Sequence, residues 1–172
     1  MAWNSGGLSS ALGNARIRDM RLLCSLLLMS ASLAVPASKP DFSGEWRLNL
    51  ERSEFSPQPA PKKLTQTIAH KDPQLKVTVL EISPLDQEVT QDLTYSTNGK
   101  ETANSVLGSV VKSTVKWEGE ELSLDSRAEF GGRTVSIKDR WRLAEKGTTL
   151  IVTRHLEGIA GTFDQTIVLD KQ

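Results

Sequence analysis

The two charged residues with the most informative placement are a carboxylate, Asp139, and a guanidinium, Arg154. They face each other in a predicted hairpin. Apolar and polar residues alternate on both sides of Lys146-Gly147, a dipeptide that favours a tight turn. Folding about this turn places Asp139 opposite Arg154 on the apolar face. A carboxylate and a guanidinium on an inward face either neutralise each other or bind a charged ligand, because buried charges are nearly always paired.

Further polar residues fall on the inward faces of the predicted strands: Gln66, His70, Glu81, Gln91, Tyr95, Asn104 and Ser113. With neighbouring tryptophans they predict a cavity that has a few polar groups for a small hydrophobic or amphiphilic ligand. The candidate ligand-binding residues are Arg154, Tyr95, Trp117, Trp141, Glu81, Gln66 and Asn104. The alternative is a filled interior, with Trp117, Trp141, Phe130 and Phe163 as its core.

The sequence contains little that predicts catalysis. Its two histidines are separated, with His155 on an outward face and His70 at a strand end. It has no recognisable Ser-His-Asp or Cys-His set, no clustered metal ligands and no glycine-rich phosphate loop. We therefore predict no catalytic residue, no metal, no cofactor and no enzymatic activity. An isomerase or cyclase would need a carboxylate in the cavity, and Glu81 is the candidate.

The N-terminal part differs from the rest of the chain. Arg16, Arg18 and Arg21 precede the uncharged run LLCSLLLMSASLAV, and small residues follow at Ala37 and Ser38. This pattern predicts a signal peptide over residues 1–37, with Met20 as a candidate true start, and a retained anchor as the alternative. The domain would then span residues 38–172 and be exported to the periplasm or the extracellular space, without stable membrane insertion.

The charge and cysteine content of that domain limit the partners and cross-links that we expect. Residues 1–37 hold three Arg and one Asp, which leaves 18 basic and 20 acidic residues and a net charge of −2. Without a basic stripe, nucleic acid is not an expected partner. The one cysteine, Cys24, lies in the predicted signal, so the domain has no disulfide.

From Phe42 onward, short alternating segments separated by turn residues predict an all-β domain. After a first strand over 42–50, the predicted strands are 64–71, 74–82, 89–97, 100–107, 110–118, 121–130, 133–144, 148–156 and 163–171. Asn98-Gly99 predicts a hairpin, and the proline-rich loop 51–63 is a candidate lid. About ten sequential antiparallel strands favour a single up-and-down barrel, with a two-sheet sandwich as the alternative.

The registers of the later strands agree with one another. Two-residue turns keep the same faces inward from 111–117 through 122–128, 135–141 and 150–156 to 163–169. In this register Arg154 lies between Asp139 and Gln165.

Gly44-Glu45-Trp46 on the first strand and Arg154 on the next-to-last strand resemble the lipocalin and fatty-acid-binding protein superfamily, the calycins. The segments DFSGEWRLNLERSEF, HKDPQLKVTV, TNGKETANS and VKWEGEEL are similar to uncharacterised exported lipocalin-like domains of bacteria. The resemblance implies a barrel whose base is closed by the tryptophan, with the arginine packed over it. The chain lacks a Thr-Asp-Tyr-like motif in mid-chain, and a proline-rich loop stands where fatty-acid-binding proteins insert two helices.

The resemblance and the register together predict a structural plug at the closed end of the barrel, made of Trp46, Arg154, Asp139 and Gln165. The alternative is that Arg154 binds a ligand carboxylate, against which Asp139 argues because it already neutralises the arginine. The predicted function is an exported binding protein for a small hydrophobic or amphiphilic ligand. A structural or interaction barrel of the cell envelope is the alternative, and an isomerase- or cyclase-type enzyme is the third reading.

Overall fold

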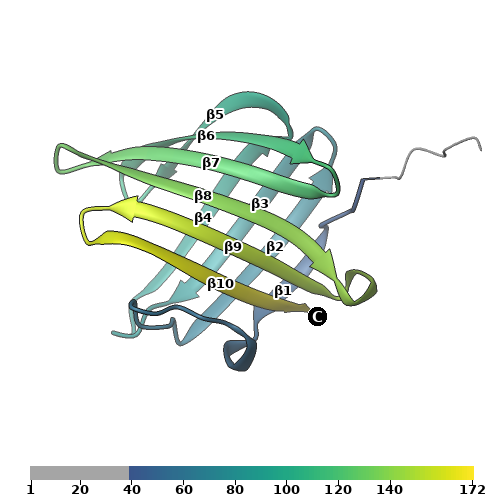
Figure 1. Ribbon diagram of the computed structural model, residues 1–172, viewed down its shortest axis with the longest axis horizontal. Coiled ribbons are helices and arrows are strands. Elements are labelled where there is room, and N and C mark those ends of the chain that lie inside the picture. Colours follow the sequence, from purple (N-terminus) through teal and green to yellow (C-terminus); the bar gives the residue numbers. More distant parts are fainter. Residues whose placement is uncertain (1–38) are drawn as a thin grey trace, which may run out of the picture. The chain divides into compact units, whose positions relative to one another are not determined.

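The computed structural model describes residues 39–172, in which ten antiparallel strands form one sheet that curls into a nearly closed barrel (Figure 1). The strands are β1 Gly44–Leu48, β2 Lys63–Lys71, β3 Gln74–Ile82, β4 Glu88–Ser96, β5 Asn98–Val106, β6 Ser109–Glu118, β7 Glu121–Phe130, β8 Arg133–Ala144, β9 Thr149–Gly158 and β10 Gly161–Lys171. Two short 3-10 helices are η1 Leu50–Arg52 and η2 Glu145–Gly147. The predicted up-and-down barrel is confirmed, and the sandwich alternative is wrong.

The predicted signal peptide and its helix, residues 1–37, lie outside the described residues. Within residues 39–172, no helix is long and apolar enough to cross a membrane.

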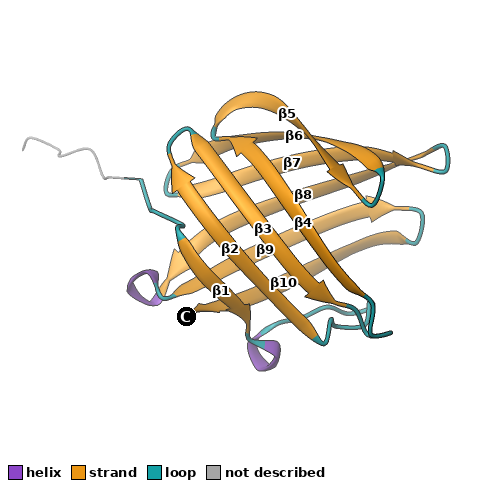
Figure 2. Ribbon diagram, turned by 180° about the vertical axis from the view of Figure 1, so that it is seen from behind, coloured by secondary structure: helices purple, strands orange, loops and turns teal. Residues whose placement is uncertain are grey.

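The sheet order is β4-β3-β2-β1-β10-β9-β8-β7-β6-β5, so nearly every strand pairs with its neighbours in the sequence. Viewed from behind, β1 to β4 cross in front of β7 to β10, and the two groups form opposite walls (Figure 2). We call the end with the β2–β3, β4–β5, β6–β7 and β8–β9 connections the closed end. The opposite end, where the β1–β2 connection lies, is the open end.

The predicted register of the second half is confirmed pair by pair. Val115 pairs with Leu124, and Leu124 pairs in turn with Asp139. Asp139 pairs with Arg154, and Arg154 with Gln165. The alternation of apolar and polar residues is sufficient to predict this register, because each connection is short and each strand has one buried face.

The hairpin predicted at Asn98-Gly99 is wrong, because β4 and β5 are the two edges of the sheet. Asn98 and Gly99 instead begin β5, where a bulge shifts the register with β6. The adjacent Thr97 is buried, and its N–H donates to the carbonyl of Pro73 at the β2–β3 turn. This long-range contact holds the chain away from a tight hairpin.

One side chain bridges the gap between β4 and β5. The Asn104 Oδ1 atom accepts from the Thr94 N–H at 2.8 Å, and its Nδ2 atom donates to the Thr94 carbonyl at 3.1 Å. The amide therefore substitutes for a backbone partner on Thr94 and satisfies both of its polar groups.

The closed end is filled by Phe42 and Trp46, which have no exposed surface. The Trp46 indole N–H donates to the Phe42 carbonyl at 2.9 Å. Lys171 crosses Gly44 to place its ammonium 5.2 Å from the centre of the Trp46 ring. A Cβ atom on Gly44 would lie 2.6 Å from Lys171 Cε, and the φ of Gly44 is +140°. The glycine of the Gly-x-Trp motif thus leaves room for the cation over the indole.

Candidate functional site

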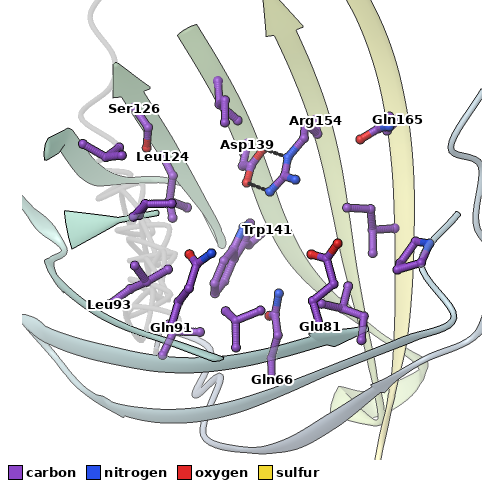
Figure 3. Close-up of a pocket in the computed structure, with 18 of the residues that line it drawn as sticks. Gln66, Glu81, Gln91, Leu93, Leu124, Ser126, Asp139, Trp141, Arg154 and Gln165 are labelled. Carbon is purple, nitrogen blue, oxygen red and sulfur yellow. Dashed lines mark hydrogen bonds and ion pairs between the residues drawn. The ribbon is translucent and has the colours of Figure 1, made fainter. Parts of the chain in front are cut away.

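The interior of the barrel holds a cavity of about 370 Å³ (Figure 3). Its wall contains both apolar and polar side chains, and the apolar ones include Val77, Val79, Leu93, Leu124 and Ile137. The polar side chains that line it are Gln66, Glu81, Gln91, Tyr95, Ser126, Asp139, Arg154 and Gln165. An apolar wall with a few polar groups is the usual composition of a small-molecule site.

The lid loop, residues 53–62, covers part of this cavity with Phe55, Pro59 and Pro61. Glu54 pairs with Thr166 of β10 through two backbone hydrogen bonds of 2.7 and 3.0 Å. The Gln165 side-chain amide adds a hydrogen bond of 3.2 Å to the Phe55 carbonyl. The predicted lid therefore lies over the site and is attached to β10.

Asp139 and Arg154 form a bidentate ion pair in the cavity wall. Arg154 donates from Nε and Nη2 to the two Asp139 oxygens, at 2.9 and 2.8 Å. The Asp139 side chain is 9% exposed, whereas that of Arg154 keeps 31% of its surface accessible. The charge of Asp139 raises the pKa of Arg154 above its ordinary value, so the guanidinium stays charged.

The predicted plug requires Arg154 to lie over Trp46, and the structure does not place it there. Lys171 is the cation over that indole. Trp46 and Arg154 flank β10 at Lys171 and Gln165, six residues apart, or about 20 Å along a strand. Arg154, Asp139 and Gln165 therefore belong to the cavity wall, and Trp46 belongs to the closed end.

Five of the seven candidate ligand-binding residues line the cavity: Gln66, Glu81, Tyr95, Trp141 and Arg154. Burial raises the pKa of Tyr95 to about 12, so its hydroxyl stays protonated. Gln66 Oε1 and Trp141 Nε1 are buried without hydrogen-bond partners among the described residues. Polar atoms of this kind suit a site that binds water or a polar group.

Trp117 and Asn104 do not line the cavity. Trp117 packs at the closed end against Phe42 and His70, with ring centres 6.0 and 5.8 Å away. Asn104 bridges the sheet gap. Both residues lie on the inward face, as the alternation of their strands predicts. Their height along the barrel axis depends on strand tilt and stagger, and the alternation pattern gives no information about these. The lid-loop residues Phe55, Pro59 and Pro61 were not among the predicted site residues, although the proline-rich run did predict the loop.

A second polar cluster surrounds His70 at the closed end. Asp72 accepts hydrogen bonds from the Thr97 hydroxyl and, at 2.9 Å, from the Trp117 indole N–H. These bonds lower the pKa of Asp72 to about 2. The His70 side chain is only 4% exposed, and its Nδ1 accepts from the Phe42 N–H at 3.4 Å. Burial lowers the pKa of His70, which is neutral while Nδ1 accepts.

We expect this histidine to make the domain acid-sensitive below pH 6.5. Because its folded-state pKa is depressed, its stabilising contribution is complete above the unfolded pKa of about 6.5 and is lost as the pH falls below it. His70→Gln keeps an acceptor for the Phe42 N–H and removes the titration. Urea midpoints between pH 7.5 and 5 should fall more steeply in the wild type than in the variant.

Other titrating groups do not obscure this comparison. The charges that face His70 are Asp41, Asp72 and Lys39. His155 has a raised pKa through its hydrogen bonds to Asp164 and Glu157, so its exposed pairs act in the opposite direction. His155 is present in both proteins, and only the difference between their slopes reports His70. Parallel slopes would contradict the assignment.

The described residues contain no group of three or more His, Cys, Asp or Glu side chains arranged to hold a metal ion.

Comparisons with known proteins agree on the fold. No family model matches the chain, and no curated protein matches it. A secretory abundant heat soluble protein from Ramazzottius varieornatus is 14% identical, with 76% of this chain and 94% of that chain aligned at a TM-score of 0.57. A mutant of the fluorescent protein UnaG is 17% identical, with 76% and 96% aligned at a TM-score of 0.51. Zebrafish ileal bile acid-binding protein complexed with cholic acid is 20% identical, with 76% and 98% aligned at a TM-score of 0.49. The likeness to the first two of these structures shows the fold alone, a β-barrel of the up-and-down type that the sequence predicts.

Proposed function

We propose that this chain is an exported binding protein that holds a small hydrophobic or amphiphilic ligand inside its barrel. The observation that carries the proposal is the cavity of about 370 Å³, which is lined by both apolar and polar side chains and so suits an amphiphilic molecule. A barrel with a purely structural role would be expected to fill this space, because an empty apolar cavity costs stability. Export rests on the charge and hydropathy pattern of residues 16–37.

Binding, rather than catalysis, is also favoured by where the histidines lie. His70 packs among the aromatic rings of the closed end. His155 is on the outer surface, where it pairs with Asp164 and Glu157. Neither lines the cavity, so the best general bases of the chain are remote from any molecule held there.

A neutral fluorescent probe tests the proposal directly. We expect delipidated protein to bind N-phenyl-1-naphthylamine, whose emission rises in apolar surroundings. Val79→Trp introduces an indole into the cavity wall and should abolish the signal. Lys76→Trp is the matched control, because it adds the same side chain to an exposed outward position of the same strand. A wild-type protein that binds no probe, or a Val79→Trp variant that binds it normally, would refute the cavity as a binding site.

A further inference from the structure

The charges in the cavity do not balance. Three of its lining side chains belong to charged residue types, two acidic and one basic: Glu81, Asp139 and Arg154. Asp139 and Arg154 neutralise each other through their bidentate ion pair. The Glu81 side chain makes no hydrogen bond or ion pair with any described residue, so the lining has one acidic side chain more than its basic one can neutralise.

Glu81 lines the cavity, and its side chain is also exposed to solvent. It lies near the end of β3, between Leu64 of β2 and Val89 of β4, on the same face as Val77 and Val79. Figure 3 shows its side chain projecting into the space that the Asp139–Arg154 pair also faces. The charge of Glu81 is the smallest of the causes that raise the pKa of Arg154, after the charge of Asp139.

Arg154 already has Asp139 as its anionic partner. Its Nε and Nη2 atoms are already bound to Asp139, and only Nη1 makes no hydrogen bond with the described residues. A ligand carboxylate that displaced Asp139 would leave a buried carboxylate without its partner, which is strongly unfavourable. A carboxylate that did not displace it would still meet the repulsion of Glu81.

On the basis of the proposed function, we infer that the cavity selects amphiphiles with an ammonium head group over those with a carboxylate, and that Glu81 determines this preference. The ammonium approaches Glu81, the one acidic side chain of the lining that has no basic partner among the described residues, and opposite charges attract. The apolar wall holds the hydrocarbon part of either ligand equally. Neutral head groups therefore bind with intermediate affinity, and the free Nη1 group of Arg154 remains as a donor to a neutral oxygen.

Three probes with the same dodecyl chain separate the head group from the tail: dodecylamine, 1-dodecanol and tridecanoate. Each competes with N-phenyl-1-naphthylamine at pH 7 and low salt, below its critical micelle concentration or, for dodecanol, below its solubility limit. We expect dodecylamine to bind roughly tenfold more tightly than tridecanoate, with dodecanol between them. Glu81→Gln should remove most of this difference by weakening amine binding and improving carboxylate binding, while dodecanol binding stays the same.

The matched control is Glu88→Gln, an exposed acid on the neighbouring strand β4 that does not line the cavity. It changes the net charge of the protein equally, so the preference should persist in this variant. If tridecanoate binds as tightly as dodecylamine, or if Glu88→Gln acts like Glu81→Gln, the inference is wrong while the binding function stands. If neither the naphthylamine nor any dodecyl probe binds, the proposed function fails and the inference fails with it.

Discussion

Asp139→Asn is expected to lower the free energy of unfolding by about 3 kcal/mol, the lower end of the ~3–5 kcal/mol range for a broken buried pair. The substitution keeps the shape of the side chain but leaves Arg154 charged and without its anionic partner. The loss is at the lower end because the Arg154 side chain keeps 31% of its surface accessible, which allows some solvation of the guanidinium. Equilibrium urea unfolding of the two proteins measures the difference.

The double variant Asp139→Leu with Arg154→Met distinguishes a lost pair from an orphan charge. It removes both charges and retains apolar volume, so it should recover much of the stability that Asp139→Asn loses. Asp125→Asn on β7 is the matched control, because Asp125 is exposed on the outer surface and should change stability by less than about 0.5 kcal/mol. Near wild-type stability of Asp139→Asn would count against a structural role for the pair.

Trp46→Ala is expected to cost about 3–5 kcal/mol, the usual range for removing a large buried aromatic side chain. The indole has no exposed surface, donates a hydrogen bond to the Phe42 carbonyl and lies beneath the Lys171 ammonium. The substitution removes all three contributions. It consumes a large part of the ~5–15 kcal/mol that stabilises a typical domain.

Trp46→Phe separates the packing from the hydrogen bond. It keeps an aromatic ring beneath Lys171 but leaves the Phe42 carbonyl without the indole donor, so we expect a smaller loss of about 1–2 kcal/mol. Arg47→Ala, at the adjacent exposed position, is the control and should be close to neutral. Urea midpoints for the three variants test this order, and equal midpoints for Trp46→Ala and Arg47→Ala would overturn it.

The two residue pairs differ in how well local sequence predicts them. Asp139 and Arg154 are cross-strand partners because a short connection and a period of two place them opposite each other. The lysine over Trp46 comes from the last residue of β10, which pairs with β1 only when the barrel closes. No local sequence pattern links Lys171 to Trp46, so the sequence did not predict this contact. The prediction that Arg154 is the cation over the indole was therefore wrong.

The amino-acid sequence alone determined the all-β class, the later strand boundaries to within one or two residues, the register from β6 to β10, and the pairing of Asp139 with Arg154. These properties follow from alternation and turn length, which act between neighbouring segments. Only the tertiary structure decided that Trp117 belongs to the closed end, that Asn104 bridges an unpaired edge, and that Phe55 covers the cavity. Each of these depends on strand tilt and stagger around the closed barrel, which sets how far along the axis a residue lies and which distant segments meet.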